Sequence, residues 1–212
     1  PLSFPMEALG ESMAHAVERY GTKLFQYSLT AGIPELREFI AARCNEKYGL
    51  SVTAADILIT TGSQQALDLI AKVTLDPGDG VIVEEPGYLG PLQTFLQYAP
   101  TFHPVALSED GLDVEGLASA LAAPQVKFIY TVPNFQNPTG LTYSVQNREA
   151  VYHVIRDKNV ILIEDDPYGE LRFAGAPVPS IHVLSMVSGS ATPVAYSASA
   201  AFRNGASMLF RI

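Results

Sequence analysis

The sequence contains a single cysteine, few basic residues and no long apolar run. One cysteine, Cys44, excludes an intramolecular disulfide bond, and its apolar helical surroundings predict a buried or half-buried thiol. No stretch approaches the ~18 apolar residues of a membrane-spanning helix, and the first residues show no charged-then-apolar signal pattern. We therefore expect a cytoplasmic protein with no membrane partner. The 13 Lys and Arg against 22 Asp and Glu give a net charge of −9, which argues against nucleic acid as a partner.

What the sequence does contain is typical of one globular α/β domain. Of its 212 residues, 48% are hydrophobic and 17% are charged, a composition that excludes a disordered chain. Residues 5–20 predict a helix opened by a proline, and residues 33–50 predict a second helix with Gly49 as its stop. Residues 174–193 are rich in proline, glycine and serine, which predicts a loop region with room for one short element.

Between these segments, short apolar runs alternate with helical patterns. The apolar runs show no polar alternation, which indicates strands that are covered on both faces. Strands and helices in turn predict crossover units, and therefore a mainly parallel sheet with helices on both faces. We expect the strands at residues 56–62, 80–87, 101–107, 126–132 and 160–166, and the helices at residues 64–75, 92–99, 114–123 and 147–159.

In an open parallel sheet, ligands bind at the carboxyl ends of the strands, so the residues after each run matter most. The stretch TGSQQA places Ser63 and Gln64 at the start of a helix, where free backbone N–H groups and a hydroxyl suit a phosphate. An ordinary serine N-cap explains the same residues. After the next run, the turn EPGYLG projects Tyr88, either as a stacking surface for a planar ligand or as a structural tyrosine.

Two further loops carry amides and carboxylates. The stretch PNFQNPTG presents Asn134 and Asn137 among rigid turns, which suits hydrogen bonding to a ligand oxygen, although Asn-Pro also occurs in plain turns. The stretch DDPYGELRF places two carboxylates at the end of an apolar strand, where burial is costly without a partner. A protonated ring nitrogen would compensate Asp165, with Tyr168 donating to an oxygen on the same ring. A capping aspartate beside a surface tyrosine is the alternative.

Taken in order, five stretches resemble the fold-type I, pyridoxal-phosphate-dependent aminotransferases of class I and II: YSLTAGIPELR, TGSQQALDL, EPGY, TVPNFQNPTG and IEDDPYGELRF. The branch that they resemble most contains 2-aminoadipate, kynurenine and aromatic aminotransferases. The resemblance runs from about residue 20 to residue 205 and implies a PLP-transferase large domain, which is a three-layer α/β/α fold. It also implies pyridoxal 5′-phosphate as the cofactor, and an amino acid and a 2-oxo acid as the substrates.

The same resemblance assigns roles to the residues that follow the later strands. Asp165 would pair with the pyridine nitrogen of the cofactor and keep it protonated. Asn137 and Tyr168 would hydrogen-bond the phenolic oxygen of the ring, and Tyr88 would stack on its face. These residues would together hold the ring as an electron sink.

The phosphate contacts that the resemblance implies come from two other segments. Ser63 and Gln64 would hold the phosphate group. Tyr27 matches a tyrosine that reaches the phosphate of the neighbouring subunit, which implies a homodimer with shared sites. Residues 1–30 would then form an N-terminal helix and dimer-contact segment, and residues 31–212 the cofactor-binding large domain.

The last stretch departs from the family pattern, in which a Ser-x-Ser-Lys turn is followed by a glycine and then an arginine. Ser197 and Ser199 match the two serines and are candidates for cofactor contacts, and Gly205 matches the glycine. Ala200 stands at the position of the Schiff-base lysine, and Ser207 stands at the position of a phosphate-binding arginine. No catalytic residue is therefore identified.

We expect a pyridoxal-phosphate-dependent aminotransferase whose sequence is incomplete here, because the family's small C-terminal domain is absent from it. A lysine-less form that binds the cofactor without turnover, or a degenerate fragment, would explain the same departures. The alternative from another functional class is a non-catalytic ligand-binding domain of the same fold, as in some transcription regulators. A lyase or decarboxylase on this fold also stays open, and we expect no metal site.

Overall fold

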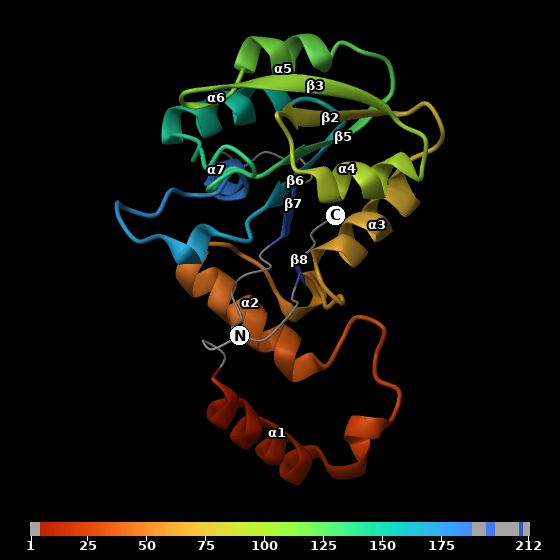
Figure 1. Ribbon diagram of the computed structural model, residues 1–212, viewed down its shortest axis with the longest axis vertical. Helices are drawn as coiled ribbons and strands as arrows, with labels where there is room; N and C mark the ends of the chain where they lie inside the picture. The colour runs from red at the N-terminus through yellow and green to blue at the C-terminus, as the bar shows by residue number, and fades with distance from the viewer. Residues whose placement is uncertain (1–4, 188–193, 198–207, 210–212) are drawn as a thin grey trace.

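The computed structural model of the chain describes residues 5–187, 194–197 and 208–209. The strands of its large sheet are β2 (Gly80–Glu85), β3 (Thr101–Ser108), β4 (Gly111–Leu112), β5 (Val126–Thr131), β6 (Ile161–Asp165) and β7 (Val194–Ser197). The helices that cover the sheet are α3 (Ser63–Thr74), α4 (Leu89–Leu96), α5 (Val114–Ala120), α6 (Val145–Ile155) and α7 (Ile181–Val187). Within the described ranges, α3 and α4 lie on one face of the sheet, and α5, α6 and α7 lie on the other (Figure 1).

The strand order is β4-β3-β2-β5-β6-β7. β2 pairs in parallel with both β3 and β5, and the parallel pairing continues from β5 to β6 and from β6 to β7. The short strand β4 pairs with β3 in the antiparallel direction. The prediction of a mainly parallel sheet with helices on both faces is therefore confirmed.

Two hydrophobic cores form because successive residues of a strand point to opposite faces of the sheet. The first core, with α3 and α4, takes Val81 and Val83 from β2 and Phe128 from β5. The second core, with α5, α6 and α7, takes the intervening Ile82 and the next residue of β5, Ile129. Neither face of these strands is left to solvent, which explains why their apolar runs show no polar alternation.

The prediction of a strand over residues 56–62 is wrong for most of its length. β1 covers only Ile57–Leu58 and pairs antiparallel with β8 (Met208–Leu209) in a separate two-stranded sheet. Beyond β1, the Ile59 N–H donates to the carbonyl of Ala31 at 3.0 Å. Gly32 lies so close that a Cβ on it would come within 2.5 Å of the Ile59 side chain. This stretch therefore packs against the coil that precedes α2 (Pro34–Tyr48) and not against the large sheet.

Both predicted N-terminal helices are present. α1 (Met6–Tyr20) has Pro5 as its N-cap residue, buries none of its side chains and extends away from the sheet (Figure 1). α2 ends at Gly49, whose left-handed φ of 67° suits glycine. Cys44 on α2 is buried as predicted, and burial raises the pKa of its thiol to about 11.

The region 174–193 holds one short helix in its described part. That helix is α7, and residues 188–193 lie outside the described residues. No helix in the part of the chain that the structure describes is long and apolar enough to cross a membrane.

A fully buried ion pair lies beneath the carboxyl end of the sheet. Arg148 of α6 and Glu164 of β6 have no solvent exposure, and their Nη1 and Oε1 atoms are 3.6 Å apart. The Glu164 carboxylate also accepts the N–H groups of Ile181 at 3.0 Å and His182 at 3.2 Å, which fixes the start of α7 against β6. Charged donors and backbone amides together compensate much of the cost of burying this carboxylate.

The pH dependence of stability is expected to carry the signature of Glu164. Burial, as the largest cause, raises the pKa of Glu164 to about 7, so the folded state retains a proton that the unfolded state releases near its ordinary pKa of about 4.3. This contribution to stability is fully present below about pH 4 and is lost as the pH rises through 7. Glu164→Gln removes the titrating group and with it this pH dependence.

Urea unfolding followed by circular dichroism between about pH 5 and about pH 7 measures the effect. The unfolding free energy of the parent, relative to that of Glu164→Gln, should fall by about 1–3 kcal/mol over this range. Glu149→Gln, which removes an exposed carboxylate from α6, is the matched control. Parallel pH profiles for the parent and Glu164→Gln would contradict the assignment.

Candidate functional site

The reversal of strand order in the sheet falls between β2 and β5. From β2 the chain crosses to β3 on one side, and it later returns to β5 on the other side of β2. Crevices at such switch points, at the carboxyl ends of the strands, are where open α/β sheets bind ligands. The carboxyl ends of β2, β5 and β6 and the segments after them carry five of the candidate residues, namely Tyr88, Asn134, Asn137, Asp165 and Tyr168.

The start of α3 offers backbone N–H groups without a side-chain cap. Its N-cap residue is Gly62, with a left-handed φ of 87° and no side-chain cap hydrogen bond. Ser63 is the first helical residue and is half-buried, so the alternative that it is an ordinary N-cap is wrong. An uncapped helix N-terminus with a hydroxyl beside it is suited to an anion.

Gln64 and Tyr88 lie together, as expected for two contacts to one ligand. The Gln64 Oε1 atom accepts a hydrogen bond of 2.6 Å from the Thr94 hydroxyl of α4. A Cβ on Gly90 would lie 2.5 Å from Gln64 Nε2 and 2.9 Å from Tyr88 Cζ, so the ends of these two side chains meet beside the same glycine. Tyr88 is the N-cap residue of α4 and is 36% exposed, so its ring is accessible from solvent.

The two amides of the loop after β5 have different surroundings. Asn134 is buried, and its Oδ1 atom accepts a hydrogen bond of 2.7 Å from Arg148 Nη2. Its amide therefore serves the internal structure of the loop. Asn137 is half-buried near the tip of the same loop, which keeps it in a position to meet a ligand.

The two aspartates at the end of β6 have different hydrogen-bond partners. Asp165 ends the strand at 3% exposure, and its Oδ2 atom accepts a hydrogen bond of 2.9 Å from the Tyr130 hydroxyl. Asp166 instead caps a turn, because its Oδ1 atom accepts the Gly169 N–H at 2.8 Å. The capping alternative therefore describes Asp166, and the ligand role of Asp165 stays a prediction.

Tyr130 is a site residue that the sequence analysis missed. Its pKa is raised well above the usual range by burial and then by the adjacent Asp165 charge, so it remains a hydrogen-bond donor. It lies beside Ile163 in the β5–β6 register, and Ile163 points to the same face as Asp165 two residues on. Strand periodicity could have found this pair, but only with the register known.

Tyr168 lies on a turn that is fastened to α2. It is half-buried and precedes the short helix η3 (Gly169–Leu171). Glu170 of that helix accepts hydrogen bonds from Arg43 Nη2 at 2.7 Å and 2.8 Å, and it forms an ion pair of 2.8 Å with Lys47 Nζ. Although burial acts in the opposite direction, these donors hold the pKa of Glu170 below its usual range. The turn that carries Tyr168 therefore has a rigid support.

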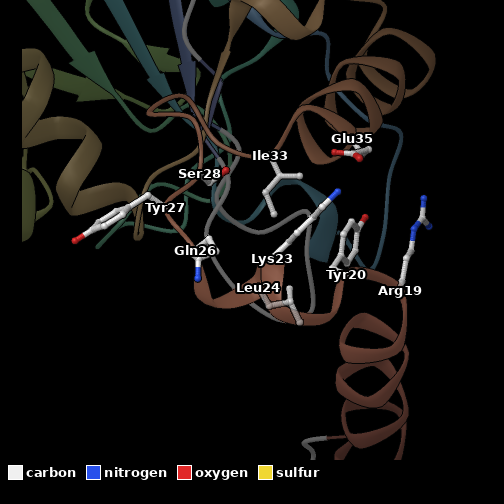
Figure 2. A pocket seen from close by; sticks show the side chains of 9 residues that line it. All are labelled: Arg19, Tyr20, Lys23, Leu24, Gln26, Tyr27, Ser28, Ile33 and Glu35. Carbon is white, nitrogen blue, oxygen red and sulfur yellow. The ribbon is translucent and has the colours of Figure 1, made fainter.

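Tyr27 has no contact with the other candidate residues among those that the structure describes, because its side chain is fully exposed, at 107% of the reference accessibility. Figure 2 shows it pointing away from the side chains of Arg19 and Glu35, which line the same hollow beside α1. A tyrosine in this position can bind a ligand only together with something outside the described residues.

The last candidates lie at the edge of what the structure describes. The backbone of Ser197 ends β7 and is the register partner of Asp165. Ser199, Ala200, Gly205 and Ser207 lie outside the described residues.

Comparisons with known proteins agree with the doubly wound fold. The profile of the family Aminotransferase class I and II matches residues 4–205, so the chain belongs to this family. An aromatic-amino-acid aminotransferase of Thermococcus litoralis is 39% identical over 186 residues, which cover 85% of this chain and 45% of that protein. The crystal structure of the α-aminoadipate aminotransferase LysN of Thermus thermophilus, complexed with N-(5′-phosphopyridoxyl)-L-leucine, is 35% identical with a TM-score of 0.87.

The matches cover most of this chain but only part of each relative. LysN covers 99% of this chain, whereas this chain covers 54% of LysN, so the chain spans about half the length of the relatives that it matches. An uncharacterized HTH-type transcriptional regulator of Escherichia coli K12 is also similar, at 34% identity over 182 residues, covering 85% of this chain and 39% of that protein. The fold is thus the α/β large-domain fold of the fold-type I aminotransferases, as predicted.

Tyr130→Phe tests the hydrogen bond that faces Asp165. Because the bond is buried and reaches a carboxylate, its loss should lower the free energy of unfolding by about 1.5–3 kcal/mol. Tyr98→Phe is the matched control, since its hydroxyl donates to Asp68 at 2.7 Å in a less buried position, where we expect a clearly smaller loss. Urea unfolding of both variants gives the comparison, and equal losses would show that the Asp165 contact is not special.

Proposed function

We propose that this chain binds pyridoxal 5′-phosphate at the carboxyl ends of β2, β5 and β6. We further propose that the whole protein transfers an amino group between an amino acid and a 2-oxo acid. The observation that carries the proposal is Asp165, a carboxylate at 3% exposure that ends β6 at the carboxyl edge of the sheet. Among planar ligands, a ring with a protonated nitrogen is one that such a group would favour.

The chemistry of the donor set fits this cofactor. The uncapped start of α3, with the Ser63 hydroxyl, suits a phosphate dianion. The accessible ring of Tyr88 suits stacking on a planar heterocycle. Asn137 and Tyr168, both half-buried on loops that follow neighbouring strands, suit the phenolic oxygen of the ring. Pyridoxal phosphate has a phosphate, a planar ring, a phenolic oxygen and a ring nitrogen. The start of α3, the ring of Tyr88, two hydrogen-bond donors and the Asp165 carboxylate match these groups in that order.

When bound, pyridoxal phosphate supplies an electron sink for bonds at the α-carbon of an amino acid. Asp165 holds a proton at the ring nitrogen, and Tyr130 stabilises the ionised state of Asp165 by donating to its Oδ2 atom. Tyr88 covers one face of the ring and excludes water from it. Ser63 and the first N–H groups of α3 fix the phosphate and thereby the position of the ring.

A lysine is the residue type that carries the covalent link and the proton transfer in this proposal, and Ala200 stands at its position. The residues that favour electron withdrawal are therefore present in this chain, whereas the amine is not at the matching place. We propose that the chain with this sequence binds the cofactor without a covalent bond at that turn.

A second candidate function is a non-catalytic ligand-binding domain of the same fold. Two observations favour it, namely Ala200 at the lysine position and the similarity to a regulator of Escherichia coli. In that case the same crevice would bind the cofactor or a related ligand, and no turnover would follow. A lysine restored at position 200 distinguishes the two candidates.

We also propose a homodimer in which the exposed N-terminal segment contacts the partner. Tyr27 is fully exposed, and Met13, Val17 and Phe25 in the same segment are more than half exposed. Such apolar side chains are typical of a surface that another chain covers. Residues 1–30 would be this dimer-contact segment and residues 31–212 the cofactor-binding large domain. The cytoplasmic location stays a prediction.

The first experiment adds pyridoxal phosphate to the parent, Asp165→Asn and Asp166→Asn. We expect the parent to bind the cofactor reversibly and Asp165→Asn to bind it at least about tenfold more weakly, because the charge opposite the ring nitrogen is lost. Asp166→Asn is the matched control, since its carboxylate caps a turn, and its affinity should stay close to that of the parent. Visible absorption titrations give the affinities, and equal weakening in both variants would overturn the role of Asp165.

The second experiment tests position 200. After treatment with borohydride and digestion, mass spectrometry should find no cofactor adduct at that turn in the parent and an adduct in Ala200→Lys. Amino acids added to the loaded Ala200→Lys variant should change its absorption if the chain derives from an aminotransferase. No adduct in Ala200→Lys would contradict the placement of the turn, and an adduct without response to amino acids would favour the binding-domain candidate.

A further inference from the structure

The two turns that carry Tyr88 and Asn137 belong to neighbouring strands. β2 and β5 pair in parallel, so the segments that follow them leave the same edge of the sheet side by side. Tyr88 comes three residues after the end of β2, and Asn137 comes six residues after the end of β5. Neither turn is regular secondary structure, so side-chain hydrogen bonds must fix the distance between the two turns.

One buried side chain lies between these turns. Gln136 is 1% exposed, and its Nε2 atom donates to the carbonyl of Pro86 at 2.9 Å and to the carboxylate of Glu84 at 2.8 Å. Its Oε1 atom accepts from the N–H and the hydroxyl of Thr139, at 3.0 Å and 2.7 Å. Both donors and both acceptor positions of the amide are thus used, one toward β2, one toward the segment that follows β2, and two within its own turn.

The Glu84 carboxylate provides the fixed end of this connection. It is 3% exposed, and besides Gln136 it accepts the Val132 N–H at 2.7 Å and the Tyr143 hydroxyl at 2.6 Å. Because it is held on β2 and bonded to the backbone just after β5, it relates the two strand ends to each other. A buried acceptor with three donors resists displacement, since moving it would leave polar groups unpaired.

We infer that Gln136 is a positioning residue that sets the distance between the ring of Tyr88 and the amide of Asn137 at the ligand crevice. This inference rests on the proposed function, because it concerns the positions of two residues that would bind the proposed cofactor. Asn137 directly follows Gln136, so a shift of the Gln136 amide moves the Asn137 backbone with it. Tyr88 is two residues after Pro86, whose carbonyl Gln136 binds. No other residue type can supply two donors and two acceptor positions from this backbone place with the same reach.

The test compares Gln136→Met with Tyr143→Phe. Methionine keeps the volume of glutamine and removes its hydrogen bonds, whereas Tyr143→Phe removes one bond to the same Glu84 carboxylate without touching either turn. Pyridoxamine 5′-phosphate is the probe, because it needs no lysine. Its dissociation constant, the emission maximum of the bound probe and the urea stability of the ligand-free chain are measured for each variant.

We expect Gln136→Met to weaken binding of the probe by about tenfold and to shift its emission maximum. Tyr143→Phe should lower stability yet leave the dissociation constant within about twofold of the parent. On the background of Asn137→Ala, the further loss from Gln136→Met should be smaller than in the parent, because the amide that it positions is already absent. Thr139→Val, which removes one bond to Gln136 and the acceptor of the Leu141 N–H, should act in the same direction but more weakly.

Several outcomes would overturn the inference. If Gln136→Met and Thr139→Val change stability only, in the manner of Tyr143→Phe, then Gln136 has no positioning role. If they do so while Asp165→Asn still weakens binding of the probe, the proposed function stands and only this inference fails. A parent chain that does not bind pyridoxamine phosphate at all would overturn both. If Gln136→Met does not fold, Thr139→Val decides between the first two outcomes.

Discussion

A carboxyl group can be buried only where donors surround it, and Glu84, Glu164 and Asp165 are buried in this way along the carboxyl end of the sheet. Glu84 on β2 is met by a backbone amide, a phenol and a glutamine. Glu164 on β6 is met by Arg148 and by the first amides of α7. Asp165 is met by Tyr130. The partners of Glu84 come in part from the loop that carries Asn137, so the cost of desolvation constrains the segments that carry the proposed ligand contacts.

The pleat of β6 distributes two adjacent carboxylates between different layers of the molecule. Glu164 points to the layer of α6 and α7, where its partners are charged or backbone groups. Asp165 points to the layer of α3 and α4, where Tyr130 also packs edge-to-face on Phe95 with ring centroids 5.8 Å apart. One carboxylate therefore supports the internal structure and the other faces the crevice, although they are neighbours in the sequence.

The parts of the structure that depend on local pattern could be predicted, and those that depend on register could not. Helix limits such as Gly49 and the strands of the parallel sheet follow from short-range signals. The stretch 56–62 has the same apolar look as the other strands, yet its partner is the coil beside α2, which no periodicity reveals. Tyr130 and Gln136 were missed for a related reason, because their partners lie 35 and 52 residues away. Asp165 and Asn137 could be proposed as ligand contacts from the sequence alone, since strand-end chemistry can be predicted locally, and their roles stay predictions.

The arm formed by α1 is expected to unfold separately from the rest of the chain. A helix of 15 residues that buries no side chain depends almost wholly on its own backbone hydrogen bonds, which are marginal in water at that length. Its amide protons should therefore exchange with solvent through local fraying, long before those of the sheet. The arm and the layered body are two thermodynamic units, and a protease that cuts after Arg19 would release the first without unfolding the second.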